Sequence, residues 1–225
     1  MEQHAERLEI GQTIGFAFQT VGAKAAPFAL LVLAIGGVNG LLDLSGSSAA
    51  TRLSSFTSLI LDVLATYFAL KVRCGDDLVI KMAFGRALGV NILSGLGILL
   101  GLILLIVPGL YLWAIWALAV PALMAEDLSV SQALSRSKSL SQGQWVRLLA
   151  LGLLTWVPIT LFAVGSYTLA DSFFGKDVQT SLPFNLLVDI VIACGSAVSS
   201  VLMAEAYITL SGQRSRLTAL QDIFA

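Results

Sequence analysis

Long hydrophobic runs alternate with short polar connections along this chain. Three segments contain no Asp, Glu, Lys or Arg: 25–42, 87–125 and 148–170. A helix needs about 20 apolar residues to cross a bilayer. The middle segment is long enough for two such helices, and Pro108–Gly109 near its centre is typical of a turn. These segments predict four membrane-spanning helices.

Two further hydrophobic segments, 53–70 and 178–204, each contain a single acid, Asp62 and Asp189 respectively. With these, the sequence predicts an all-α, polytopic membrane protein with six transmembrane helices arranged as three hairpins. We expect one membrane domain over residues 1–225, with kinks at Pro121 and Pro158. The predicted spans are 26–44, 55–72, 89–107, 110–125, 147–167 and 184–208.

The polar connections on one side of the predicted spans also contain helical patterns. Apolar residues recur at helical spacing within 8–22, 78–88 and 129–142, which predicts three interfacial helices lying on the membrane. The last of these begins with the capping-box pair Ser129 and Gln132, and Gly143 suits its C-terminal cap.

The distribution of Lys and Arg predicts the orientation. Of the 13 basic residues, only Arg52 and Lys176 fall on one side of the predicted spans. The remaining bases are Arg7, Lys24, Lys71, Arg73, Lys81, Arg86, Arg136, Lys138, Arg147, Arg214 and Arg216. Because cytoplasmic loops are enriched in Lys and Arg, both termini are expected in the cytoplasm.

The composition agrees with a membrane protein. Hydrophobic residues make up 57% of the chain and charged residues 12%, whereas soluble domains contain about 25% charged residues. The mean hydropathy is +0.88. The net charge of −1 gives no indication of nucleic acid as a partner.

Signatures of catalysis or metal binding are missing from the sequence. Cys74 and Cys194 share no motif with His4, the only histidine, so neither a disulfide framework nor a Cys/His metal site is expected. The chain has no GxSxG, Walker A or HExxH motif. We therefore expect no enzyme activity and no cofactor. Residues 1–10 lack the pattern of a cleavable signal, so we expect insertion without cleavage.

The two intramembrane acids are the main candidates for function. Each lies on a polar helix face in the outer half of its span, at similar depth: Ser55, Ser58, Asp62 and Thr66 on one face, and Asn185, Asp189, Ser196 and Ser200 on the other. Such faces line a cavity or proton path, or else each acid is protonated or hydrogen-bonded and holds helices together. Glu205 is expected to be a solvated helix end.

Small residues and bases add two weaker signals. Gly36 and Gly40, Gly97 and Gly101, and approximately Gly195 and Ser199, have the GxxxG spacing that permits close helix contact; packing within the chain is favoured over dimerisation. Arg136, Lys138 and Arg147 lie in a stretch without acids, 128–170. They are candidates for contact with anionic lipids, or they serve only to set the orientation.

The segment 99–151 carries a family resemblance. It contains Val107-Pro108-Gly109, Pro121, Glu126, Ala133-Leu134, Arg136-Ser137, Leu140, Gly143, Trp145 and Arg147. With these residues the chain resembles the membrane domain joined to some bacterial glycerophosphodiester phosphodiesterases, and the related YciC-like inner-membrane proteins. The aromatic residue that this family often has after Arg-Ser is replaced here by Lys138.

The resemblance implies six membrane helices with cytoplasmic interfacial helices in a bacterial-type inner membrane. It does not imply phosphodiesterase activity, which belongs to a separate soluble barrel in the fused proteins. The leading hypothesis is a non-catalytic protein that interacts with membrane lipids, or a structural module that binds a protein partner or a second copy. The alternative is a small proton-coupled transporter or channel that uses Asp62 and Asp189.

Overall fold

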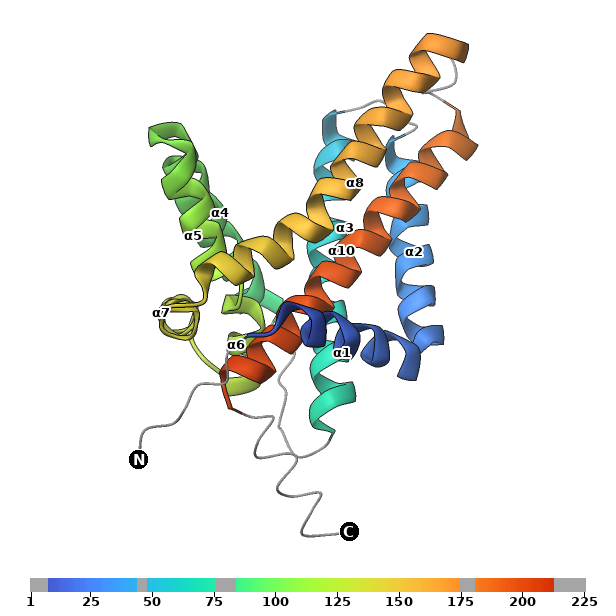
Figure 1. The fold of residues 1–225 in the computed structure, drawn as a ribbon. Coiled ribbons are helices and arrows are strands. Elements are labelled where there is room, and N and C mark those ends of the chain that lie inside the picture. Colours follow the sequence, from blue (N-terminus) through green and yellow to red (C-terminus); the bar gives the residue numbers. More distant parts are fainter. Residues whose placement is uncertain (1–7, 44–47, 76–83, 175–180, 213–225) are drawn as a thin grey trace, which may run out of the picture. The chain divides into compact units, whose positions relative to one another are not determined.

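The computed structural model describes residues 8–43, 48–75, 84–174 and 181–212, and they are helical apart from short turns. Figure 1 shows the helices in chain order. Their bounds are α1 Ile10–Ala23, α2 Ala25–Asp43, α3 Ser48–Cys74, α4 Phe84–Leu104, α5 Ile106–Trp116, α6 Ala119–Glu126, α7 Val130–Ser141, α8 Trp145–Phe174 and α10 Leu182–Leu210. His4 and residues 78–83 of the second predicted interfacial helix lie outside the described residues.

Six helical segments are long and apolar enough to cross a membrane, as the sequence predicts. They are Ala25–Asp43, Leu53–Cys74, Phe84–Leu104, Ile106–Glu126, Trp145–Phe173 and Leu182–Leu210. The protein is therefore an all-α polytopic membrane protein. The large apolar side chains that remain exposed, such as Leu30 and Leu161 at 68% each, suit contact with lipid tails.

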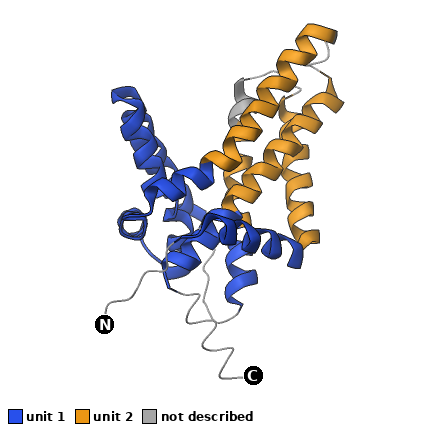
Figure 2. Cartoon of the chain, in the orientation of Figure 1, with its two compact units in different colours: residues 1–23, 66–152, 201–225 blue, residues 24–65, 153–200 orange. Residues whose placement is uncertain are grey.

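The described residues divide into two compact units (Figure 2). Unit 1 consists of residues 1–23, 66–152 and 201–225, and unit 2 of residues 24–65 and 153–200. Unit 1 contains α1, α4, α5, α6 and α7 with one end each of α3, α8 and α10. Unit 2 contains α2 and the remaining parts of α3, α8 and α10.

Consecutive spanning helices pack against each other as hairpins. In unit 2, Asn39 of α2 hydrogen-bonds Ser58 of α3, and the Tyr167 ring of α8 meets the Phe184 ring of α10 edge to face at 5.3 Å. In unit 1, a Cβ added to Gly101 of α4 would lie 2.9 Å from the Gly109 Cα of α5.

Glycines of the GxxxG pairs lie at helix contacts within the chain. In unit 2, Gly36 and Gly40 of α2 face the backbone of Ile190 and Leu186 of α10, at 2.9 and 3.0 Å from an added Cβ. In unit 1, Gly97 faces the Trp116 ring. The preference for packing within the chain is confirmed at these positions.

The turn between α4 and α5 differs from the prediction at Pro108–Gly109. The only non-helical residue is Leu105, and Pro108 lies inside the first turn of α5. Proline is tolerated there because the first N–H groups of a helix have no intrahelical partner. Helix α4 begins at Phe84, so residues 84–88, predicted as the end of an interfacial helix, are the first turn of α4.

A second break divides the fourth span and is consistent with the kink predicted at Pro121. Helix α5 ends at Trp116 and α6 begins at Ala119, with Ala117 and Leu118 between them. Pro121 has no N–H to donate, and its ring would clash with the carbonyl of residue 117 in a continuous helix. Leu118 and Ala119 at this break are buried, at 0% exposure.

Candidate functional site

Asp62 in unit 2 is held by two serines of the other predicted polar face. The hydroxyls of Ser196 and Ser200 on α10 donate to its Oδ1 at 2.6 and 3.1 Å. Ser196 and Ser200 are one helical turn apart, so both reach the same carboxyl oxygen. The structure therefore brings together two of the predicted site residues, Asp62 and Ser196, as a contact between α3 and α10.

A second polar contact in unit 2 joins α2 to α3. The amide of Asn39, 8% exposed, donates from Nδ2 to the Ser58 hydroxyl at 3.2 Å and accepts a hydrogen bond from Thr57 through Oδ1. Ser58 is a predicted site residue, but Asn39 is not. The signal in the sequence is a single amide within the otherwise apolar segment 25–42.

Asp189 does not share a site with Asp62. It precedes Ser196 by seven residues on α10, a separation of about 10 Å along the helix. The similar depth of the two acids in the bilayer stays a prediction. Of the other predicted residues, Asn185 and Thr66 are buried at 5% and 3% exposure, and Thr66 belongs to unit 1.

Two carboxyl oxygens in unit 2 are buried without a hydrogen bond from the described residues. They are Oδ1 of Asp43, the last residue of α2, and Oδ2 of Asp189. Buried polar atoms are normally hydrogen-bonded. Asp189 therefore differs from Asp62, which has its acceptor satisfied by the two serines.

Glu205 in unit 1 is buried, which contradicts the expected solvated helix end. Its residue is 2% exposed. Its Oε1 lies 3.0 Å from Nε of Arg73 on α3 and accepts a hydrogen bond from the Thr20 hydroxyl of α1 at 2.5 Å. The Arg73 guanidinium also lies 4.9 Å from the centre of the Phe16 ring. Glu205 thus links three helices.

A second ion pair lies in the same unit, around Glu126 at the end of α6. Its carboxylate accepts a hydrogen bond from Nε of Arg136 on α7 at 2.9 Å and another from the Tyr207 hydroxyl of α10, also at 2.9 Å. Tyr207 is fully buried. One of the three predicted lipid-contacting bases, Arg136, is therefore engaged within the protein.

Serine hydroxyls of α7 hydrogen-bond the backbone at the break between α5 and α6. The Ser137 hydroxyl donates to the carbonyl of Ile115 at 2.7 Å and accepts the N–H of Leu118 at 3.1 Å. The Ser141 hydroxyl reaches the same carbonyl at 3.3 Å. Both serines are 0% exposed. Helix α7 thus supplies the hydrogen bonds that the interrupted helix lacks.

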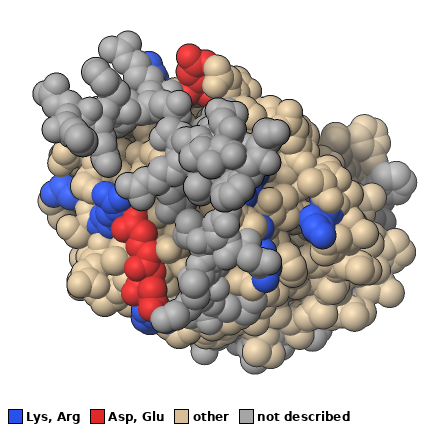
Figure 3. Space-filling view, turned by 90° about the horizontal axis from the view of Figure 1, so that it is seen from below, with Lys and Arg blue, Asp and Glu red and all other residues tan. Residues whose placement is uncertain are grey.

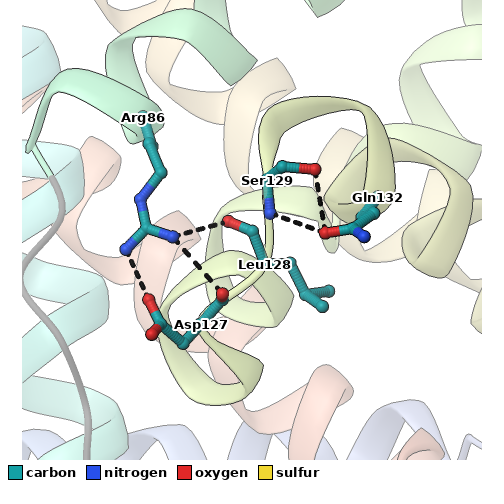
Figure 4. A network of polar contacts seen from close by, with 5 residues as sticks. All are labelled: Arg86, Asp127, Leu128, Ser129 and Gln132. Atoms are coloured by element: carbon teal, nitrogen blue, oxygen red, sulfur yellow. Dashed lines mark hydrogen bonds and ion pairs between the residues drawn. The ribbon is translucent and has the colours of Figure 1, made fainter.

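The connection from α6 to α7 is fixed by a polar network (Figure 4). Arg86 of α4 forms an ion pair with Asp127 and donates to the carbonyl of Leu128 at 3.0 Å. Asp127 has φ 51°, a left-handed conformation that ends α6. At the start of α7, the N–H of Ser129 donates to Oε1 of Gln132 at 3.0 Å, as the predicted capping box requires.

The other two predicted lipid contacts are less constrained. Lys138 on α7 is exposed and has no hydrogen bond or ion pair to the described residues. Arg147 is half-buried and donates to the Gln144 amide oxygen at 2.9 Å. Figure 3 shows basic side chains beside acidic ones on this face, and another basic side chain on a surface of uncharged residues.

The described residues include no group of three or more His, Cys, Asp or Glu that could hold a metal ion. Comparison of the chain with protein-family models, curated proteins and solved structures finds no match.

Proposed function

We propose that this chain is a non-catalytic protein of a bacterial-type inner membrane, with both termini in the cytoplasm, that binds anionic phospholipid at the junction of α7 and α8. The observation that carries the proposal is the exposed ammonium group of Lys138, which forms no ion pair with the described residues. Arg147 lies nearby at the start of α8, and its guanidinium donates a hydrogen bond to the neutral side-chain amide of Gln144. Two cations are therefore available to headgroup phosphates.

The aromatic residues beside these bases support an interfacial position. Trp145, the first residue of α8, packs edge to face against Tyr111 at a centroid distance of 5.4 Å. Both rings are more than a third exposed, at 36% and 40%. Trp and Tyr are enriched at membrane–water interfaces, where Lys and Arg meet the headgroups.

Neutralising both cations tests the proposal. Each base near an anionic membrane surface contributes about 1 kcal/mol, so Lys138→Gln with Arg147→Gln should reduce the preference for phosphatidylglycerol over phosphatidylcholine by about 30-fold. The measurement is native mass spectrometry of the purified protein in mild detergent with both lipids added.

Lys24→Gln is the matched control, because Lys24 is also exposed but lies between α1 and α2. It should leave the preference within about twofold of wild type. Undiminished preference in the double variant, or an equal loss in Lys24→Gln, would show that the bases at the α7–α8 junction do not select the lipid.

Proton-coupled transport is a second candidate, favoured by the buried carboxyl oxygens of Asp43 and Asp189 that accept no hydrogen bond from the described part of the chain. An acid in a spanning helix is a functional candidate by default because its insertion is costly. In this scheme Asp189 carries the proton, whereas Asp62 joins helices through Ser196 and Ser200.

Under this second scheme Asp189→Asn should abolish proton uptake, because an amide does not exchange the proton. Asp62→Asn should retain most of it, since the amide oxygen still accepts the serine hydrogen bonds. The assay is reconstituted vesicles with a pH-sensitive dye, under an imposed pH gradient, with and without a small-molecule cell extract. Equal uptake by empty and protein-containing vesicles in both conditions would remove this candidate.

A further inference from the structure

The turn between α4 and α5 is strongly apolar. Residues 95–110 are all Gly, Leu, Ile, Val or Pro. At the tip, Ile103, Leu104, Leu105, Ile106 and Val107 are 67–77% exposed. A loop in water on the far side of the membrane would expose five large aliphatic side chains to solvent, which the hydrophobic effect opposes. The tip is therefore suited to a hydrocarbon environment.

The hairpin is also short above its contacts with α7. Helix α7 meets α4 where Val130 packs on Gly89, and it meets α5 where Ser137 bonds Ile115. From these contacts to the tip, α4 rises about 22 Å and α5 about 14 Å. A bilayer hydrocarbon core is about 30 Å thick, so neither arm crosses it from the level of α7.

The surface of α7 sets that level. Its exposed side chains are polar: Ser131, Gln132, Ser135, Lys138 and Ser139. A helix with this surface belongs among headgroups rather than in hydrocarbon. This step rests on the interfacial position of α7 given under the proposed function.

We propose that α4 and α5 form a re-entrant hairpin whose tip, residues 102–107, ends among the acyl chains of the leaflet next to α7. The hairpin then enters and leaves the membrane on one side. Both ends of the hairpin lie on the side of α7 whether it crosses the membrane twice or is re-entrant. The orientation expected from the Lys and Arg distribution is therefore unchanged. The partner of the tip is the acyl-chain region of a single leaflet.

The backbone of the turn limits the number of polar groups that this placement exposes to hydrocarbon. Irregular backbone is disfavoured there because its N–H and C=O groups lack water. In this hairpin only Leu105 is non-helical. The Leu105 N–H donates to the carbonyl of Gly101 at 3.0 Å, and the Leu105 carbonyl accepts the N–H of Gly109 at 3.5 Å. Pro108 has no N–H, so the polar backbone groups left at the tip are those that the end of α4 and the start of α5 leave without an intrahelical partner.

Cysteine labelling tests the placement. The single variants Leu105→Cys and Ile106→Cys are made in a background with Cys74→Ala and Cys194→Ala. A membrane-impermeant maleimide is added to intact cells, where it reaches only the outer side. It is then added to opened cells, where it reaches both sides. Lys176→Cys serves as the outer control and Lys138→Cys as the inner one. From outside, both tip variants should be labelled at less than a tenth of the level of Lys176→Cys. After the cells are opened, both should be labelled at less than a tenth of the level of Lys138→Cys.

Strong labelling of Leu105→Cys from outside intact cells would overturn the proposal, because the tip would then have crossed the membrane. Brominated lipids give a second readout, since a bimane on the tip cysteine should be quenched more by bromines along the acyl chain than by bromines near the headgroup. The reverse order would also overturn it. Labelling of Lys138→Cys from the inner side, together with the phospholipid preference, reports separately on the proposed function.

Discussion

Glu205→Ala is expected to lower the free energy of unfolding by about 3 kcal/mol. The substitution leaves the Arg73 guanidinium without the carboxylate 3.0 Å from its Nε and removes the acceptor of the Thr20 hydroxyl. Removing one partner of a buried ion pair costs about 3–5 kcal/mol. We expect the lower end of this range because the Arg73 side chain is 26% exposed. Titration with a denaturing detergent, followed by tryptophan fluorescence, measures the change.

Glu205→Gln is the control that separates charge from hydrogen bonding. The amide oxygen still accepts from Thr20, so this variant should lose clearly less stability than Glu205→Ala. The double variant Arg73→Met with Glu205→Met should recover stability relative to Glu205→Ala, because no buried charge is left alone. If Glu205→Ala unfolds at the same detergent fraction as wild type, the carboxylate is not part of the core of unit 1.

Ser137→Ala is expected to lower the free energy of unfolding by about 2 kcal/mol, because Ser137 hydrogen-bonds the backbone at the break between α5 and α6. It removes the hydroxyl that accepts the N–H of Leu118 and donates to the carbonyl of Ile115. A buried polar group left without a partner costs about 1–3 kcal/mol. The Ile115 carbonyl still has the Ser141 hydroxyl, so Ser137→Ala combined with Ser141→Ala should cost more than Ser137→Ala alone.

Ser139→Ala on the same helix is the matched control. Ser139 is exposed, and among the described residues its hydroxyl donates to the carbonyl of Arg136 within α7. It should change the free energy of unfolding by less than about 0.5 kcal/mol. Equal effects of Ser137→Ala and Ser139→Ala would show that α7 does not stabilise the break between α5 and α6.

Hydropathy was sufficient to find the six long apolar helical segments, because length and the absence of charge are local properties of the sequence. Capping is local too: the Ser129–Gln132 pair hydrogen-bonds as predicted, and Gly143 has φ +74° after α7. The turn between α4 and α5 was misplaced by three residues, since proline is also favoured in the first turn of a helix.

The polar contacts between residues far apart in the sequence were not predictable by the same reasoning. Tyr207 and Glu126 are 81 positions apart, and Arg73 and Glu205 are separated by 132. A charge near the end of a hydropathy-defined span looks solvated unless the packing of other helices is known. Asp62 was easier, because an acid in a span needs compensation and Ser196 lay on a second polar face. For Asp189, nothing in the sequence indicated that Oδ2 would be buried without a hydrogen bond from the described residues.

The hydrogen bond from Thr20 to Glu205 joins residues that are 185 positions apart. At a synthesis rate of about 5–20 residues per second, roughly 10–40 s pass between the translation of the two. During that interval α1 lacks the acceptor that fixes it to α10. The first helix to be made thus completes its native contacts only near the end of synthesis, and a nascent chain arrested before Glu205 should leave α1 more open to proteolysis than the full chain does.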